Sequence, residues 1–338
     1  MKNSLSSVVQ MLVTEGKGIL AADESDSTCG KRFEKYGISQ TPEMRQKWRE
    51  LLFSTPDVER GLSGVILFDE TIRQKTGIGL SFPKLLESRG ILTGIKVDQK
   101  TEPINSVQGK PSEEEVTKGL DGLSARLAEY KKLGASFTKW RAVIRIGTEL
   151  PTDECIRENA RRLAAYAREC QKAGLVPILE PEILLDGTHT LARSEEVLTE
   201  TLRAVFDEVK KVGCDLSCLI LKSSMALPGK ESGERASPKE IAEATLRAFF
   251  ASVPKEVQGI VFLSGGQTPE EATVRLNEIV KQAKKQNAPW RISFSFSRAL
   301  QDPVLKEWAG DDTKKESAQA IFTKRVSETA RAARGEYA

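Results

Sequence analysis

Eight short runs of apolar and β-branched residues recur along the chain, and stretches with helical spacing separate them. The runs are residues 18–22, 64–68, 93–97, 137–143, 176–180, 218–222, 259–263 and 291–296. Strands that alternate with helices predict parallel pairing through right-handed crossovers. Eight such units predict an α/β protein with a closed (β/α)8 TIM barrel. An open doubly wound sheet is the alternative, but no Gly-x-Gly-x-x-Gly motif follows the first run, which weakens its dinucleotide-binding form.

Four of the intervening stretches carry clear helix signals. Residues 151–173 have a proline and an acidic residue near their start and a glycine directly after their end. Residues 112–133 begin with Ser-Glu-Glu-Glu, the arrangement of a capping box. Residues 238–251 and 269–286 each begin with proline, which suits the first turn of a helix.

The remaining segments add helices to this framework without dividing it. Polar residues 98–111, with two prolines and a glycine, predict an exposed loop. No linker is visible, so residues 1–338 are expected to form a single barrel domain. Extra helices are expected before the first strand at residues 3–14, between the first two strands at residues 42–54, and after the last strand at residues 302–308 and 312–333.

Composition and charge narrow the class of protein. The chain is 39% hydrophobic and 29% charged, and it lacks an apolar run of about 18 residues, so we expect a soluble protein without a membrane partner. The amino-terminal residues resemble neither a secretion signal nor a transit peptide, which favours the cytoplasm. The net charge of +3 is mixed along the chain, so nucleic acid is not an expected partner.

The cysteines and the one histidine leave few routes to catalysis. The five cysteines are dispersed, and Cys214 and Cys218 have no nearby histidine or second cysteine pair, so neither disulfides nor a zinc site is expected. His189 lies in a polar turn and is expected at the surface. A catalytic triad or a histidine-ligated metal is hard to build from it. Lysines and carboxylates must therefore carry any polar chemistry.

Charged residues mark the ends of five neighbouring predicted strands. In such a barrel, reactive side chains come from the carboxyl ends of strands, where residues two apart face the same way. Ordinary salt bridges between strands could account for any single residue. Burial of so many charges costs several kcal/mol each unless they pair or bind something, which favours a functional site. The residues are Asp23 and Ser25, Lys96 and Asp98, Lys139 and Arg141, Glu180 and Glu182, and Lys222.

Lys222 is the candidate nucleophile, and two loops are candidates for binding phosphate. A lysine amine attacks a carbonyl only when uncharged, and the apolar run before Lys222 and a neighbouring cation such as Lys139 would favour that form. A structural lysine is the alternative. The Ser264-Gly265-Gly266 turn after the seventh run and Arg298 after the eighth occupy the usual phosphate position of such barrels, although a plain tight turn competes with this interpretation.

Jointly, these segments resemble the class I fructose-bisphosphate aldolase family across nearly the whole chain. The motifs are GILAADES from Gly18, GIKVD from Gly94, KWR from Lys139, EPEIL from Glu180, Leu221-Lys222, FLSGGQ from Phe262 and RALQ from Arg298. The resemblance implies a glycolytic and gluconeogenic lyase, free of cofactor and metal. It would reversibly cleave fructose 1,6-bisphosphate into dihydroxyacetone phosphate and glyceraldehyde 3-phosphate.

The resemblance also implies a role for individual residues. Lys222 would form an imine with the C2 carbonyl, Glu180 would remove water from the carbinolamine, and Asp23 would take the proton of the C4 hydroxyl. Lys139 and Glu182 would support these proton transfers. The substrate and its two phosphates would be bound by Lys96, Arg141, Ser264, Gly265, Gly266, Arg298, Ser25, Lys31 and Arg32.

The chain departs from the family pattern at three places. Ser297 replaces a glycine that is common before the phosphate-binding arginine, and Ser223-Ser224 replaces a common Pro-Asn, so altered phosphate affinity is expected. Many members carry a flexible tail ending in a catalytic tyrosine, whereas this sequence stops at Ala338. Tyr337 matches a tyrosine before that tail and receives no catalytic role. Members are commonly homotetramers, which implies a homo-oligomer here.

Two rival functions stay open at this point. Another lysine-imine barrel enzyme, such as a transaldolase or a deoxyribose-phosphate aldolase, would use the same nucleophile, although two phosphate-binding ends favour a bisphosphate. A phosphosugar-binding or scaffold protein without activity would lack the nucleophile or the acid. Lys222, Glu180, Lys139 and Asp23 are all present, which speaks against the second rival.

Overall fold

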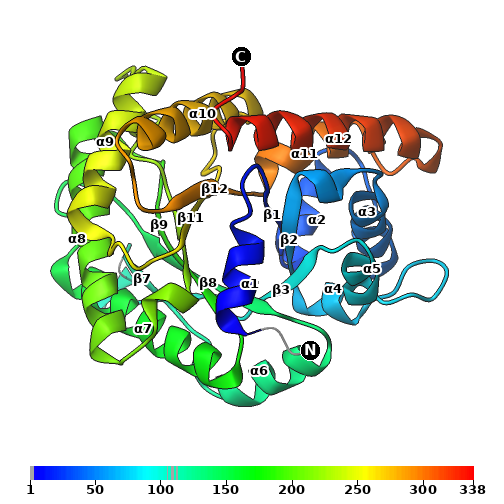
Figure 1. The fold of residues 1–338 in the computed structure, drawn as a ribbon, viewed down its shortest axis with the longest axis horizontal. Coiled ribbons are helices and arrows are strands. Elements are labelled where there is room, and N and C mark those ends of the chain that lie inside the picture. Colours follow the sequence, from blue (N-terminus) through cyan, green and yellow to red (C-terminus); the bar gives the residue numbers. More distant parts are fainter. Residues whose placement is uncertain (1–3, 105, 108–109, 112) are drawn as a thin grey trace.

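A closed barrel of eight parallel strands forms the centre of the protein, as Figure 1 shows for the computed structural model. The structure describes residues 4–104, 106–107, 110–111 and 113–338. Strand β1 pairs in parallel with both β2 and β12, which closes the barrel. The predicted barrel is confirmed, and the open sheet is wrong. The strands are β1 (Gly18–Ala22), β2 (Leu62–Leu67), β3 (Leu92–Lys96), β8 (Phe137–Ile144), β9 (Val176–Ile183), β10 (Ile220–Ser223), β11 (Gly259–Phe262) and β12 (Arg291–Phe296).

Helix α1 (Leu5–Leu12) covers the amino-terminal end of the barrel, where it crosses the centre in Figure 1. Its residues Val8, Val9 and Leu12 are buried in one cluster with inward-facing side chains of the strands. Phe137 fills the space beside Gly64 and Gly94, where an added Cβ would lie within 3.0 Å of its ring. The amino-terminal half of the barrel is therefore a packed core.

The remaining helices surround the barrel, and most predicted helices are confirmed. Thr152 caps α7, and complete capping boxes at Ser237 and Thr268 start α9 and α10. The helix predicted at residues 302–308 begins earlier than expected, at Arg298 directly after β12. The helices are α2 (Asp26–Glu34), α3 (Pro42–Ser54), α4 (Asp69–Arg73), α5 (Phe82–Ser88), α6 (Leu123–Lys132), α7 (Asp153–Ala173), α8 (Leu191–Lys211), α9 (Pro238–Ser252), α10 (Pro269–Lys285), α11 (Arg298–Trp308) and α12 (Lys315–Ala332).

The helix predicted for residues 112–133 is wrong in its first half. Strand β7 (Glu115–Thr117) pairs antiparallel with β4 (Thr101–Pro103), and α6 begins only after Gly122. Glu114 does not cap a helix of its own, because its carboxylate accepts hydrogen bonds from Thr152 N and Oγ1, both at 2.7 Å. The β-branched residues that follow it suit a strand.

The loop predicted for residues 98–111 is also more regular than expected. It contributes β4 and two short strands, β5 (Ser106–Val107) and β6 (Lys110–Pro111), which pair antiparallel. Ser112 and Gly109, on which the predictions partly rested, lie outside the described residues.

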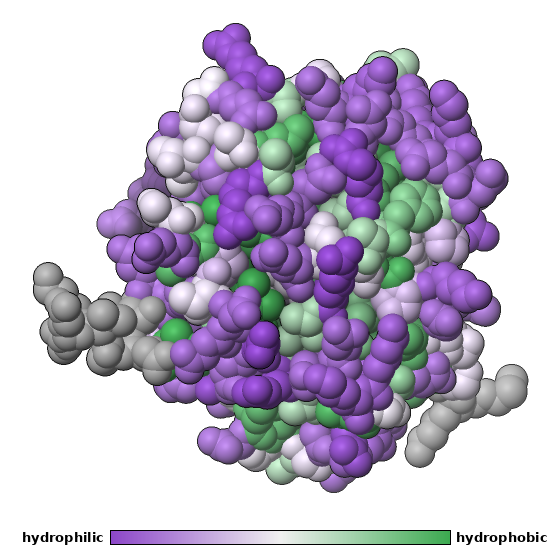
Figure 2. All heavy atoms as spheres, turned by 90° about the vertical axis from the view of Figure 1, so that its left-hand side faces the viewer, coloured by the Kyte–Doolittle hydropathy of each residue, from purple (hydrophilic) through white to green (hydrophobic). Residues whose placement is uncertain are grey.

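Polar side chains and small apolar areas alternate on the face over α8 in Figure 2. Among the described helices, none is long and apolar enough to cross a membrane.

Candidate active site

A cavity of 1490 Å³ opens at the carboxyl ends of the barrel strands. It is lined from β1, β3, β8, β9 and β10 and from the turns that follow β11 and β12, as a site on this fold requires. Three predicted site residues, Lys31, Arg32 and Gly266, are not part of the lining. The predicted residues that do line it are Asp23, Ser25, Lys96, Lys139, Arg141, Glu180, Glu182, Lys222, Ser264, Gly265 and Arg298.

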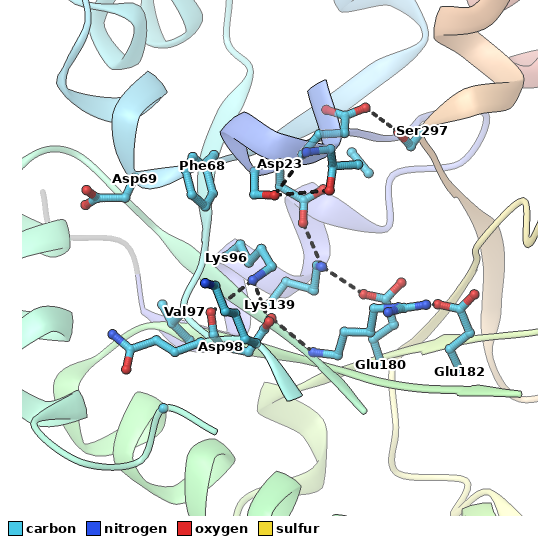
Figure 3. Close-up of a pocket in the computed structure, with 18 of the residues that line it drawn as sticks. Asp23, Phe68, Asp69, Lys96, Val97, Asp98, Lys139, Glu180, Glu182 and Ser297 are labelled. Carbon is cyan, nitrogen blue, oxygen red and sulfur yellow. Dashed lines mark hydrogen bonds and ion pairs between the residues drawn. The ribbon is translucent and has the colours of Figure 1, made fainter. Parts of the chain in front are cut away.

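Four buried charged residues form the centre of the site. Lys139 Nζ lies 2.6 Å from Asp23 Oδ2 and 3.1 Å from Glu180 Oε2, and Figure 3 shows these three side chains pointing toward one another. Lys222 Nζ lies 2.9 Å from Glu180 Oε1. None of the four is more than 9% exposed. Two lysines thus share one carboxylate, Glu180.

The strand geometry explains why these side chains meet. Glu180 pairs with Arg141, and Lys139 lies two positions earlier on the same face of β8. Lys222 ends an apolar segment of β10, the next strand around the barrel. The contact between Lys139 and Glu180 Oε2 lacks hydrogen-bond alignment, and within the described residues this oxygen accepts no hydrogen bond. It is therefore available to hold or transfer a proton.

The lysines keep the two carboxylates of this cluster ionised. Although burial raises the pKa of Asp23, Lys139 and then Lys222 lower it to about 2. Burial likewise raises the pKa of Glu180, and the same two lysines lower it below its ordinary value. Burial lowers the pKa of Lys139, but Asp23 and Glu180 raise it well above the usual range. At neutral pH the unliganded site contains two carboxylates and a Lys139 cation.

A second group of charges lies nearer the opening. Lys96 Nζ is 2.5 Å from Asp98 Oδ1, and Arg141 Nε forms an ion pair with Glu182. The same Asp98 accepts a hydrogen bond from Arg141 N at 3.3 Å, which ties the two cationic residues together. Both cations are only partly buried and line the cavity. An anion can bind at this end by displacing Asp98 or Glu182 from these cations.

The turn after β11 and the start of α11 form a cradle at the other end. Gly265 and Gly266 have φ angles of 51° and 83°, a backbone conformation that favours glycine. Gln267 N donates to Ser264 O at 2.9 Å and closes the turn. Arg298, the first residue of α11, makes no ion pair with any residue that the structure describes. An unpaired guanidinium beside exposed backbone N–H groups is suited to a phosphate.

The helix α2 places its two predicted phosphate ligands away from the cavity. Arg32 pairs with Glu24 and, at 2.7 Å, with Asp302, while Lys31 is exposed on the outside. Their substrate contacts stay a prediction, because the unliganded structure does not bring either residue into the lining. Ser25, which caps α2, does line the cavity.

Glu24 is a cavity residue that the sequence analysis missed. Its carboxylate pairs with Arg49 at 2.7 Å and accepts hydrogen bonds from Ser297 Oγ at 2.7 Å and Gln301 Nε2 at 3.0 Å. Burial raises the pKa of Glu24, but Arg49 and then Arg32 lower it. The acidic neighbour of Asp23 was visible in the sequence, but its partners Arg32 and Arg49 come from the helices α2 and α3.

His189 is not the surface residue that its polar turn predicted. It is only 9% exposed, and burial lowers its pKa. The loop after β10 covers it, since a Cβ on Gly229 would lie 3.0 Å from His189 Nδ1.

All five cysteines are free. Among the described residues, no group of three or more histidine, cysteine, aspartate or glutamate side chains could hold a metal ion.

The fold and the site define a class of (β/α)8-barrel enzyme in which a buried lysine lies among carboxylates, between two places suited to anions. The sequence matches the family described as "Fructose-bisphosphate aldolase class-I" over residues 4–338. The chain belongs to this family, as its motifs predicted.

Relatives and a solved structure agree with this assignment. A protein of Xanthomonas campestris named "Probable fructose-bisphosphate aldolase class 1" is 47% identical over 98% of both chains. Aldolase B of Gallus gallus is 42% identical over 99% of this chain and 91% of its own. A Plasmodium falciparum fructose-bisphosphate aldolase, solved with TRAP and an inhibitor, superimposes with a TM-score of 0.95 at 41% identity, covering 99% of this chain and 95% of the other.

Proposed function

We propose that the protein is a metal-independent class I fructose-bisphosphate aldolase that cleaves fructose 1,6-bisphosphate reversibly through an imine on Lys222. The observation that carries this proposal is the buried cluster in which Glu180 contacts both Lys222 and Lys139, and Lys139 contacts Asp23. A nucleophile, a proton carrier and a base within contact distance are what an imine-based aldol cleavage requires.

Imine formation begins at Lys222. A proton can pass from its ammonium group to Glu180 Oε1, 2.9 Å away, and leave the uncharged amine that attacks the C2 carbonyl. Glu180 then gives this proton to the hydroxyl of the carbinolamine, which leaves as water. Lys139 remains cationic beside the reaction, because its pKa is raised by the two carboxylates despite burial. The product of this stage is a protonated imine.

Carbon–carbon cleavage follows from the charge on that imine. Asp23, ionised with a pKa of about 2, accepts the proton of the C4 hydroxyl. The electrons of the C3–C4 bond move to the imine nitrogen, which leaves an enamine on Lys222 and releases glyceraldehyde 3-phosphate. Protonation of C3 and hydrolysis of the imine then release dihydroxyacetone phosphate. Glu182, held by Arg141, supports the proton transfers.

Two anion-binding ends support a bisphosphate substrate. Ser264, Gly265, Gly266 and Arg298 would bind the phosphate on the ketose end, which stays with the imine. Lys96 and Arg141, with Ser25, Lys31 and Arg32 from the α2 region, would bind the far phosphate. A transaldolase takes a monophosphate, which would leave the second group of cations, around Lys96 and Arg141, without a phosphate to bind.

The expected setting of the enzyme rests on its relatives. One 45% identical relative from Arabidopsis thaliana is named "Fructose-bisphosphate aldolase 5, cytosolic", which supports a cytoplasmic location. A homotetramer and a place in glycolysis and gluconeogenesis are proposed from the family resemblance.

Trapping of the imine tests the proposal. Borohydride reduction in the presence of dihydroxyacetone phosphate, followed by peptide mass mapping, is expected to give a stable adduct on Lys222. An adduct on another residue, or cleavage abolished by EDTA, would overturn the mechanism. Comparison of fructose 1,6-bisphosphate with fructose 6-phosphate tests the substrate, and faster turnover of the monophosphate would exclude the assignment.

A further inference from the structure

We propose that Lys230 is a further phosphate-binding residue of the active site, acting on the ketose-end phosphate together with Arg298. This inference rests on the proposed function, since it concerns the substrate of the same site. Lys230 lies in the loop between β10 and α9, which no motif singled out. It is not part of the cavity lining and reaches the phosphate cradle from its outer rim.

The geometry around Gly266 brings the two cations to one place. A Cβ built on Gly266 would lie 3.2 Å from Lys230 Nζ and 3.6 Å from Arg298 Nη2. The space that a side chain would occupy at this position is thus flanked by an ammonium and a guanidinium group. Gly266 also has the positive φ of the cradle, at 83°. Glycine here leaves the backbone open and lets both cations approach it.

The loop that carries Lys230 is held in position by its neighbour. Lys230 N donates to Leu185 O at 3.0 Å, and the residues on either side of it donate to His189 O and Gly187 O. Gly229 fits against this neighbour only without a side chain, since a Cβ would lie 2.2 Å from Gly187 O. The backbone of Lys230 is therefore fixed, while its side chain extends toward the cradle.

The charges around Lys230 leave it free to accept a phosphate. Its only ion pair with a described residue is to Asp186, at 3.3 Å, and both side chains are about half exposed, at 47% and 58%. Such a pair is weak in water. Arg298 has no acidic partner among the described residues. A phosphate dianion at the cradle would meet two cations and could displace the single carboxylate of Asp186.

Ser297, next to Arg298, does not supply a side-chain donor at this end. Its hydroxyl donates to Glu24 Oε1 at 2.7 Å and is directed to that carboxylate, not to the cradle. The residue that replaces the common glycine therefore supplies no hydroxyl donor for the phosphate. The ammonium of Lys230 can supply one from the opposite side.

The substitution Lys230→Met tests the inference. A charge-assisted hydrogen bond that is equally strong in the ground and transition states changes KM and leaves kcat unaltered. We expect an increase of about tenfold in KM for fructose 1,6-bisphosphate and a similar rise in the inhibition constant of inorganic phosphate. Lys230→Arg, which keeps the charge, should retain most of the affinity.

Two control variants separate phosphate binding from local structure. Lys284→Met removes a lysine of similar exposure, paired with Glu15 at 2.9 Å on the other side of the protein, and is expected to leave both constants unchanged. Asp186→Asn removes the partner of Lys230 and should leave KM unchanged or lower it. The inference would be overturned if the KM and the phosphate inhibition constant of Lys230→Met lie within twofold of the wild-type values. It would also be overturned if Lys230→Arg loses as much affinity as Lys230→Met.

The inference and the proposed function can fail separately. Absence of cleavage by the wild-type protein would contradict the proposed function, whereas binding of inorganic phosphate, measured by calorimetry on wild type and Lys230→Met, still tests Lys230. Active wild-type enzyme with equal phosphate affinity in both proteins would contradict the inference alone.

Discussion

Lys139 is the cation on which the buried acids of the site depend, so Lys139→Met should destabilise the protein. Although burial raises the pKa of Asp23, Lys139 is the strongest of the cations that lower it, from 3.8 to about 2. A shift of this size corresponds to roughly 2 kcal/mol of stability at neutral pH. Removal of one partner from a buried ion pair typically costs about 3–5 kcal/mol. We expect the free energy of unfolding to fall by about 2–5 kcal/mol near pH 7.

The pH dependence of this loss has a definite sign. In the wild type, folding lowers the pKa values of Asp23 and Glu180. The two carboxylates therefore stabilise the protein at a pH above their ordinary pKa values, and this stabilisation is lost as the pH falls through their pKa values in the folded protein. In Lys139→Met, the main cation that opposes the effect of burial on the two pKa values is missing. The carboxylates therefore bind protons at a higher pH than in the wild type. The difference between the two proteins should therefore be largest near pH 7 and smaller at about pH 4.5.

Urea unfolding at both pH values, at one protein concentration, measures this difference. Lys284→Met is the control, because an exposed pair contributes little, about 0–1 kcal/mol. A Lys139→Met protein as stable as the wild type near pH 7 would refute the reasoning. So would a stability difference that grows as the pH falls.

The proposed steps can be separated by three further variants. Glu180→Gln should lower kcat by about 10²–10⁴ by slowing imine formation, which stopped-flow mixing with dihydroxyacetone phosphate would detect as a lost early phase; unchanged imine formation would contradict its role. Asp23→Asn should abolish cleavage but still give the borohydride-trapped adduct on Lys222, and loss of the adduct would place Asp23 in the earlier step. Deletion of Tyr337 and Ala338 should change the cleavage rate by less than about tenfold, or 1.4 kcal/mol of barrier, and a larger loss in steady-state assays would assign this terminus a catalytic role.

The sequence was sufficient to predict the barrel because each strand is a local pattern. Short runs that contain β-branched residues, such as 176–180, favour strands, and the alternation of strands and helices leaves few topologies. The same local rule placed Lys139, Glu180 and Lys222 at one end of the barrel. That one domain comprises residues 1–338 stays a prediction.

The failures have a common physical cause, which is pairing between distant segments. Glu114 looked like part of a capping box, but Thr152 supplies its hydrogen-bond donors. Glu24 received no role, because its partners Arg49 and Arg32 lie on two helices. His189 is buried by a loop from the next strand. None of these partners can be identified from the spacing of residues along the chain.

The helix across the amino-terminal end of the barrel has a consequence for the order of events in catalysis. Because Val8, Val9 and Leu12 fill that end, substrates reach Lys222 and products leave it through the opposite end of the barrel. Since the described residues place the open cavity at the carboxyl ends of the strands, the product that is not covalently attached has to depart before water can reach the attached one. Kinetically, this favours an ordered release in which the aldehyde leaves first, and in the synthetic direction the ketone enters first.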